Sequence, residues 1–197
     1  MLRDYAPLAL NALHAGAGYA QPTQAALDKV TPDDPALSVM TDLKRVTAVI
    51  VLPGDTVDEA HARMIQRGVR LLLVVDQNRK VLGIITASEL LGEKPVQVAS
   101  ERGIRREEIS VRDVMTPHER LEVLDLADLR AAKVGHIVTT LHKVGRQHAL
   151  VAERDAKGQQ TVVGLFSATQ IARQLGVAIQ TSQVARTFSE IEALLSR

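Results

Sequence analysis

The sequence contains no cysteine and no tryptophan, and aromatic residues make up only 2% of its 197 positions. Without cysteine the chain cannot form disulfides, thiolate nucleophiles or cysteine-ligated zinc sites. With so few aromatic rings it lacks the stacking platforms that bind single-stranded nucleic acids. We therefore expect an aliphatic core built from valine, isoleucine, leucine and alanine.

Neither an excess of charge nor a long apolar run is present. The 24 basic and 23 acidic side chains nearly cancel, so there is no basic surplus of the kind that nucleic-acid binding needs. Apolar runs such as Leu71–Val75 have the length of a strand and fall well short of the ~20 residues of a membrane-spanning helix. Asp4, Asn11 and His14 interrupt the N-terminal region where a signal peptide would be apolar. We expect a cytoplasmic protein with no nucleic-acid partner and no membrane partner.

Signatures of catalysis and of metal binding are also missing. His136 and His142 lie six residues apart, which places them about 120° apart on a helix, and His148 falls on a strand. No phosphate-binding loop, complete dinucleotide fingerprint or nucleophile elbow is present. We expect no catalytic residues, no metal site and no required cofactor, so the chain is predicted not to be an enzyme.

An internal repeat organises what is present. Val-Met-Thr occurs at 39–41 and again at 114–116, and a closing motif of Gly, two apolar residues and Ser or Thr begins at 83 and again at 164. The opening motifs are 75 residues apart and the closing motifs 81. Two copies of one unit usually pack face to face, because each alone cannot bury its apolar side. This arrangement predicts a pseudo-symmetric cleft between the copies.

Each copy has the same predicted order of elements. The first has a strand over 48–52, a helix capped by Thr56 and ended by Gly68, strands over 71–75 and 81–85, and a helix after Thr86. The apolar residues of its first helix recur at helical spacing: Val57, Ala60, Met64 and Ile65. The second copy has a strand near 121–126, a helix bearing Val134, Ile137, Val138 and Leu141, strands over 149–152 and 161–166, and a last helix bearing Ile171, Ala172 and Leu175.

We divide the chain into five parts on this basis: an N-terminal extension (1–35), the first repeat (36–92), a linker with a short helix (93–109), the second repeat (110–176) and a C-terminal helix (177–197). Pro95 and Gly103 bracket the linker helix. The C-terminal helix begins at a predicted capping box, Thr187 to Glu190, and has one apolar face: Phe188, Ile191, Leu194 and Leu195.

A strand-helix-strand-strand-helix unit that opens with Val-Met-Thr and closes with the glycine motif resembles a CBS domain, the module named after cystathionine beta-synthase. Two in tandem resemble a Bateman module, here as a stand-alone pair covering about residues 36 to 176. The resemblance implies an α+β fold of two βαββα units packed as a pseudo-symmetric pair, usually in a homodimer. It also implies regulatory binding of an adenosyl ligand, namely AMP, ADP, ATP or S-adenosylmethionine, in the cleft between the repeats.

The resemblance also implies candidate ligand-binding residues. Thr86 and Ser167 match the hydroxyl position of the family's closing motif, and Glu89 and Gln170 stand where the family has a ribose-binding aspartate. Glu89 keeps the charge, whereas Gln170 has one acceptor and no charge. Three further candidates face the implied cleft, one at a strand entrance and two at phosphate-binding positions: Thr47, Arg70 and His148.

A second interpretation of the closing motifs needs no ligand. Thr86 to Glu89 and Ser167 to Gln170 both match the capping box that begins a helix. The alternative to a sensor that signals to an unknown partner protein is therefore a ligand-free dimeric interaction scaffold. An open cleft beside Thr86 favours the sensor, and side chains filling that cleft favour the scaffold.

Overall fold

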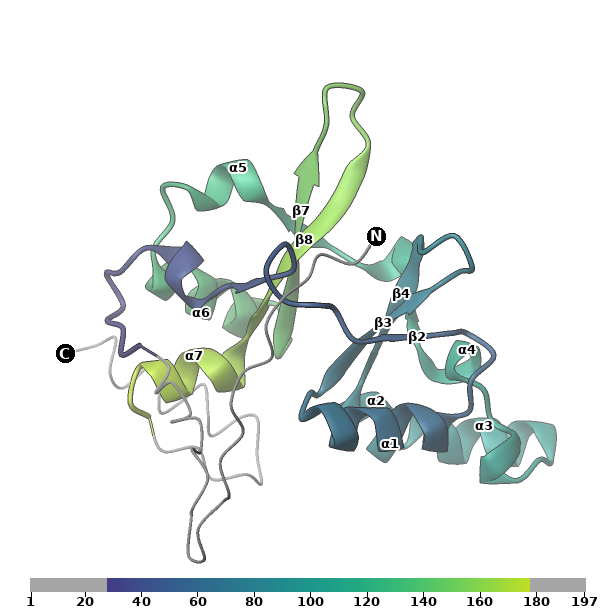
Figure 1. Cartoon of the computed structure of the whole chain (residues 1–197). Coiled ribbons are helices and arrows are strands. Elements are labelled where there is room, and N and C mark those ends of the chain that lie inside the picture. Colours follow the sequence, from purple (N-terminus) through teal and green to yellow (C-terminus); the bar gives the residue numbers. More distant parts are fainter. Residues whose placement is uncertain (1–27, 178–197) are drawn as a thin grey trace, which may run out of the picture.

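The computed structural model describes residues 28–177, so the predicted C-terminal helix and most of the predicted N-terminal extension lie outside the described residues. The described chain forms two units side by side, each with a four-stranded sheet and its own helices (Figure 1). None of the described helices is long and apolar enough to span a membrane.

The first sheet has the strand order β2-β3-β4-β5. Its strands are β2 (Ile50–Val51), β3 (Leu71–Val75), β4 (Val81–Thr86) and β5 (Thr116–Pro117). The helices of this unit are α1 (Val57–Arg67), α2 (Ala87–Leu91), α3 (Lys94–Arg102) and α4 (Val111–Val114), with the 3-10 turns η2 (Arg106–Glu108) and η3 (His118–Arg120). β2 runs parallel to β3, and the other pairs are antiparallel.

The second sheet has the order β1-β8-β7-β6. Its strands are β1 (Thr41–Asp42), β8 (Gln160–Ser167), β7 (His148–Arg154) and β6 (Val123–Asp125). α5 (Leu126–Leu129), α6 (Val134–Lys143), α7 (Ala168–Gln174) and the 3-10 turn η1 (Ala36–Val39) pack with it. The parallel pair is again the first one along the chain, β6 with β7, so the mixed α+β order of the first unit recurs.

Local signals explain how α1 begins and ends. The Thr56 hydroxyl accepts a hydrogen bond from the Glu59 amide, the Glu59 carboxylate accepts one from the Thr56 amide, and Gly68 ends the helix in the left-handed region at φ 63°. Of the four apolar residues at helical spacing, Val57, Ala60 and Met64 are buried, whereas Ile65 is 70% exposed. One residue turns a helix by about 100°, which carries Ile65 past the edge of the buried stripe.

The opening motifs are exchanged between the two sheets. β1, from the start of the first repeat, pairs with β8 of the second, with Asp42 opposite Gly164. β5, from the start of the second repeat, pairs with β4 of the first, with Pro117 opposite Gly83. The predicted strand over 48–52 is shorter than expected, because β2 contains only Ile50 and Val51.

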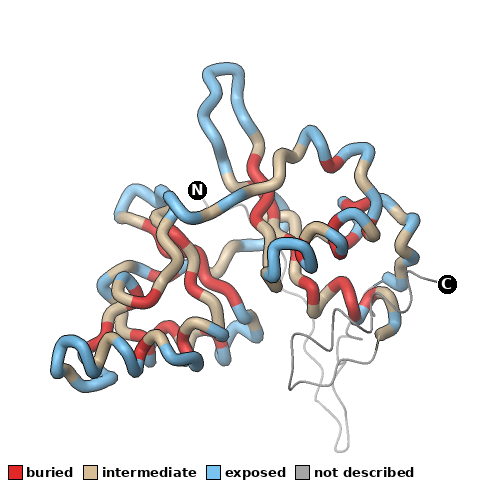
Figure 2. The backbone as a smooth tube through the Cα atoms, turned by 180° about the vertical axis from the view of Figure 1, so that it is seen from behind, coloured by how far each residue is buried: buried red, intermediate tan, exposed pale blue. Residues whose placement is uncertain are grey.

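Three apolar clusters stabilise the pair of units, and two of them contain residues from the opening segment of the other repeat. The core of the second unit includes Ala36 and Val39 from the first opening segment, and the core of the first unit includes Val111 and Val114 from the second. The third cluster joins the sheets, since its fully buried members come from β3 and β7: Leu71, Leu73, Val75 and Leu150. Figure 2 shows buried residues along these inner strands and also in the helices of both units, while the β7–β8 hairpin tip is exposed.

All five residues of β3 are buried because both faces of the strand are covered. Leu72 and Val74 face the helices of their own unit, whereas Leu71, Leu73 and Val75 face the second unit. Successive side chains of a strand point to opposite faces, so a strand covered on both sides becomes continuously apolar. The inter-unit face of this strand forms the floor of the site described next.

Candidate functional site

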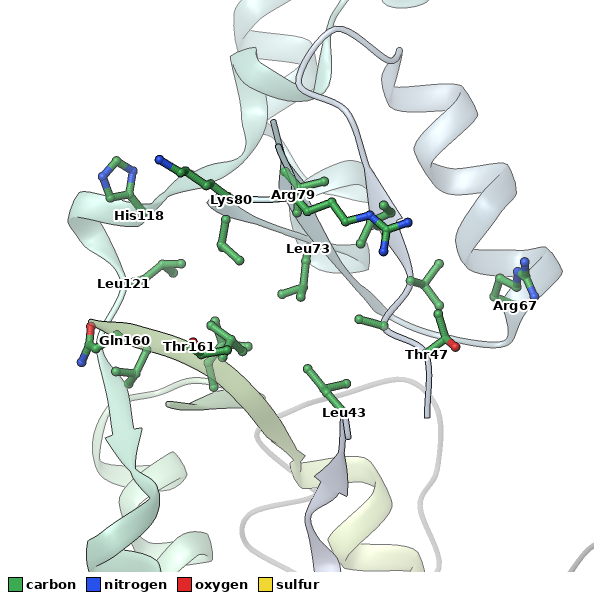
Figure 3. Close-up of a pocket in the computed structure, with 18 of the residues that line it drawn as sticks. Leu43, Thr47, Arg67, Leu73, Arg79, Lys80, His118, Leu121, Gln160 and Thr161 are labelled. Atoms are coloured by element: carbon green, nitrogen blue, oxygen red, sulfur yellow. The ribbon is translucent and has the colours of Figure 1, made fainter. Parts of the chain in front are cut away.

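A cavity of about 1160 Å³ opens between the two sheets. Its floor is aliphatic and comes from both units, with Leu73 and Val75 of β3 on one side and Leu150 and Val162 on the other. Thr47, the predicted binding residue at a strand entrance, and the adjacent Ala48 line the same space. In Figure 3 Thr47 lies at one end of the cavity and Leu121 and Gln160 at the other, with Leu73 and Thr161 between them.

The rim of this large cavity is positively charged. Its lining includes Arg63, Arg67, Arg79 and Lys80, together with His118, and no aspartate or glutamate among the described residues. Figure 3 places Lys80 toward His118 and Arg79 toward the side on which Arg67 lies. The space therefore combines an apolar floor with cationic walls, which suits a ligand that has both an apolar ring system and negative charge.

A smaller cavity of about 310 Å³ lies beside Thr86. Two glutamates line it, Glu89 and Glu122, and so do Arg146 and His148. Arg146 Nη2 lies 3.3 Å from Glu122 Oε2, so its charge is already paired. Leu121 and Leu150 line both cavities and form part of the wall between them.

The Glu89 carboxylate is fully engaged by neighbouring donors. Oε2 accepts hydrogen bonds from the amide and the hydroxyl of Thr86 at 2.9 and 3.0 Å, and the Thr86 hydroxyl accepts one from the Glu89 amide. Oε1 accepts from Lys94 Nζ at 2.8 Å and from the Thr116 hydroxyl at 2.5 Å. The predicted capping box at Thr86 is confirmed, and the same carboxylate also holds the exchanged strand β5.

Gln170 occupies the equivalent position in the second unit and has the equivalent partner. The Thr41 hydroxyl, from exchanged strand β1, donates to Gln170 Oε1 at 3.2 Å. Ser167 makes no side-chain hydrogen bond at the start of α7, so the capping interpretation is wrong at this position. The Gln170 side chain therefore contacts β1 rather than the helix start, and both threonines of the opening motifs bond to the residue three positions after the Ser or Thr of a closing motif.

His148 begins β7 opposite Ser167, next to the smaller cavity. Burial, together with the positive charge of Arg70, lowers the pKa of His148 from 6.5 to about 4. The imidazole is therefore neutral at neutral pH. His148 and Arg70 belong to different units, so this electrostatic contact spans the interface between them.

The predicted binding residues thus fall in different places. Thr47 lines the large cavity, whereas Thr86, Glu89 and His148 line the smaller one. Arg70, Ser167 and Gln170 are not among the residues that line either cavity.

The cationic residues of the large cavity were not among the predicted binding residues. Arg79 and Lys80 lie in the β3–β4 turn, between the predicted strands over 71–75 and 81–85, and Arg67 ends α1. A run of two cations immediately after a turn of Asp, Gln and Asn was the available signal.

No group of three or more metal-ligating side chains is found within residues 28–177.

Comparison with known proteins gives a family match in the first repeat. The family model described as "CBS domain" matches residues 36–95. No curated protein matches the sequence.

Solved structures share the fold across both repeats. An uncharacterized conserved protein from Pyrococcus horikoshii is 20% identical, covers 78% of this chain and 100% of its own, and superposes with a TM-score of 0.54. The CBS domain pair of protein MJ0100, in complex with 5′-methylthioadenosine and S-adenosyl-L-methionine, is 18% identical over 74% of this chain and 98% of its own, with a TM-score of 0.50. Protein MJ1225 from Methanocaldococcus jannaschii is 20% identical over 72% of this chain and 49% of its own, with a TM-score of 0.53. The family model therefore identifies a CBS domain in the first repeat, and these similarities show that the two repeats together have the fold of a CBS pair.

Proposed function

We propose that the protein is a regulatory module that binds an adenosyl ligand between its two repeats and passes the resulting change in conformation to a partner protein. The observation that carries this proposal is the large cavity, which lies between the sheets and has an aliphatic floor and a cationic rim. A structurally similar CBS pair was solved with 5′-methylthioadenosine and S-adenosyl-L-methionine. We infer that the chain is not an enzyme and needs no cofactor.

In this proposal the adenine ring lies on the apolar floor near Leu73 and Val75. Thr47 and the residues after it approach the cavity ahead of β2, where backbone groups are available to hydrogen-bond the ring edge. The predicted set Thr86, Glu89 and His148 faces the smaller cavity and remains a candidate site for an adenosyl group without a phosphate chain.

Binding shifts a conformational equilibrium only by the difference in affinity between the two states. The large cavity is lined by both units, so a ligand that contacts both walls binds best when the units are held at one relative position. We infer that this coupling is the signal that a partner protein reads, and that the protein acts in the cytoplasm as a homodimer. Light scattering of the purified protein measures the dimer directly.

A ligand-free interaction scaffold is the second candidate, favoured by one specific observation. Thr86 and Glu89 already hydrogen-bond to each other, and the Glu89 carboxylate also accepts hydrogen bonds from Lys94 and Thr116. This motif therefore has a structural role without any ligand.

A thermal-shift panel with AMP, ADP, ATP and S-adenosylmethionine separates the two candidates. A ligand at 100 times its dissociation constant stabilises the folded protein by about 2.7 kcal/mol, which raises Tm by about 5–11 °C at this size. To locate the site, Thr161→Trp places a large ring in the cavity at an exposed strand position, and Thr139→Trp on the exposed face of α6 is the matched control. The proposal requires a shift that Thr161→Trp abolishes and Thr139→Trp retains. If no ligand in the panel shifts Tm at millimolar concentration, the scaffold is favoured.

A further inference from the structure

Within the described residues, the large cavity has more positive charge than its carboxylate partners balance. Arg63 is already engaged, because its Nη1 donates to the Ile50 carbonyl at 2.9 Å and lies 3.2 Å from Asp55 Oδ2. Arg67, Arg79 and Lys80 form no ion pair with any carboxylate within residues 28–177. The formal net charge of the whole chain is only +1, because acidic and basic side chains are almost equal in number. The cations at this rim are therefore a local concentration of positive charge.

The β3–β4 turn fixes the position of two of these cations. Asp76 Oδ1 accepts hydrogen bonds from the amides of Asn78 and Lys80 at 2.9 and 2.8 Å, which ties the turn closed. Arg79 has φ 61° and is the one non-glycine residue with positive φ in the described part of the chain. The turn thus sets two consecutive cations at the rim of one cavity, and Figure 3 shows them spread between His118 and Arg67.

The two residues at the family's ribose-binding position do not line this cavity. Glu89 lines the smaller cavity and accepts hydrogen bonds from Thr86, Lys94 and Thr116, while Gln170 accepts one from Thr41. The polar groups of the large cavity besides its cations and His118 are neutral: Thr47, Gln66, Gln159, Gln160 and Thr161. A ribose therefore meets no carboxylate there, whereas a row of phosphates meets Arg67, Arg79 and Lys80.

We propose that the large cavity recognises its ligand through a chain of phosphates, and that it takes one nucleoside di- or triphosphate per protein chain with little contribution from the ribose hydroxyls. This inference rests on the proposed function, since it names which adenosyl ligand the same cavity takes. S-adenosylmethionine has a net positive charge, because its sulfonium and ammonium groups outweigh its one carboxylate, so it gains less from this rim than a nucleoside polyphosphate does. A single phosphate supplies fewer negative charges than a di- or triphosphate does, so it pairs with fewer of these three cations.

The smaller cavity does not suit a second such ligand. It has about a quarter of the volume, 310 against 1160 Å³, and two glutamates line it. The nearby Arg146 is paired with Glu122, so this cavity offers little unpaired positive charge to an anion. A stoichiometry of one follows from this asymmetry between the two cavities.

Isothermal titration calorimetry at low salt and without added magnesium tests the proposal on the full-length protein. The ligands are ATP, ADP, AMP, 2′-deoxy-ATP and S-adenosylmethionine, and inorganic tripolyphosphate is the competing probe. We expect ATP and ADP to bind at least about tenfold more tightly than AMP and S-adenosylmethionine, the effect of one further charge-assisted contact. 2′-Deoxy-ATP binds within about twofold of ATP, tripolyphosphate displaces ATP, and the stoichiometry is one per chain.

Charge-neutralising variants show whether the rim is responsible. Arg79→Gln and Lys80→Gln each weaken ATP binding by about tenfold, and higher salt reduces the difference from the unmodified protein because exposed charges are screened. Arg130→Gln is the matched control, since Arg130 is exposed at the end of α5 and lines neither cavity.

Three outcomes would overturn the inference. If S-adenosylmethionine or AMP binds as tightly as ATP, or if 2′-deoxy-ATP binds more than about tenfold less tightly than ATP, phosphate recognition is refuted while the adenosyl-binding function stands. If Arg79→Gln and Lys80→Gln bind ATP like Arg130→Gln, the ligand does not use this rim. If only S-adenosylmethionine binds, the inference fails and the proposed function stands; if no ligand of the panel binds, both fail.

Discussion

Replacing Gly83 with alanine tests the exchange of opening strands between the two sheets. Gly83 lies on β4 opposite Pro117 of β5, and a methyl group at this position would collide with the Thr116 carbonyl oxygen. That oxygen is part of the backbone, so no rotation of a side chain relieves the clash. β5 must move away from β4, and the Thr116 hydrogen bond to Glu89 weakens with it.

The pseudo-symmetric glycine provides an internal comparison. A methyl group on Gly164 would lie 2.6 Å from the sulfur of Met40, which is the flexible part of a side chain. Overpacking costs about 1–3 kcal/mol, and a glycine-to-alanine change gains about 0.4–1 kcal/mol by restricting the unfolded chain. Because its clash is with rigid backbone, we expect Gly83→Ala to destabilise by about 2–3 kcal/mol and to lower Tm by about 4–12 °C, and Gly164→Ala to cost about 1 kcal/mol or less.

Thermal and urea denaturation followed by circular dichroism measure these differences. Gly54→Ala is the control, because an added methyl group there meets no atom within 4 Å and the backbone φ is not positive. Met40→Ala should rescue Gly164→Ala by removing the obstructing sulfur, while no side-chain truncation rescues Gly83→Ala. If Gly83→Ala is as stable as Gly54→Ala, β5 does not pack on β4 and the exchanged arrangement is refuted.

Three further predictions address the hydrogen bond, the buried histidine and the first helix. Thr116→Val removes a donor to Glu89 without changing shape, and we expect urea denaturation to show a loss of about 1–2 kcal/mol, whereas an unchanged midpoint would contradict the described contact. Burial and a neighbouring guanidinium hold the pKa of His148 at about 4, against 6.5 in the unfolded chain, so its stability contribution is present above pH 6.5 and is lost as pH falls toward 4. NMR titration should give this low pKa directly, and His148→Gln should remove that part of the acid sensitivity. Met64→Ala should cost about 2–5 kcal/mol and Ile65→Ala almost nothing, because Met64 is 3% exposed and Ile65 70% exposed; similar costs would refute the assigned helix face.

Much of the fold could be predicted because its signals are local. The cap at Thr56, the glycine at 68 and the apolar run of β3 each determine the structure of the residues next to them. The exchange of β1 and β5 could not be predicted in this way. A two-residue edge strand such as Thr41–Asp42 carries the same sequence whichever sheet it joins, so only the packing of Ala36 and Val39 in the other unit's core decides the pairing.

The candidate site was less predictable, for a related reason. Glu89 and Gln170 were identified as either ribose acceptors or capping residues, yet each bonds to a threonine of the other repeat's opening motif. Both threonines were visible as part of the repeated motif, but their partners lie 129 and 27 residues away along the chain. Arg79 was missed because polar residues are expected in a turn. Its position in the sequence therefore gave no indication that it lines a cavity between the two units.

Exchange of the opening strands also bears on how the chain folds. Thr41 pairs with Leu165, so the second sheet closes only by contacts between distant parts of the sequence, and the first sheet lacks an edge strand until Thr116 has been made. Such non-local pairing slows folding and leaves the edge of β4 open to other chains in the meantime. We expect the two repeats to unfold in one cooperative transition, and a fragment ending before residue 110 to aggregate. What the sequence presents as two copies is then a single thermodynamic domain.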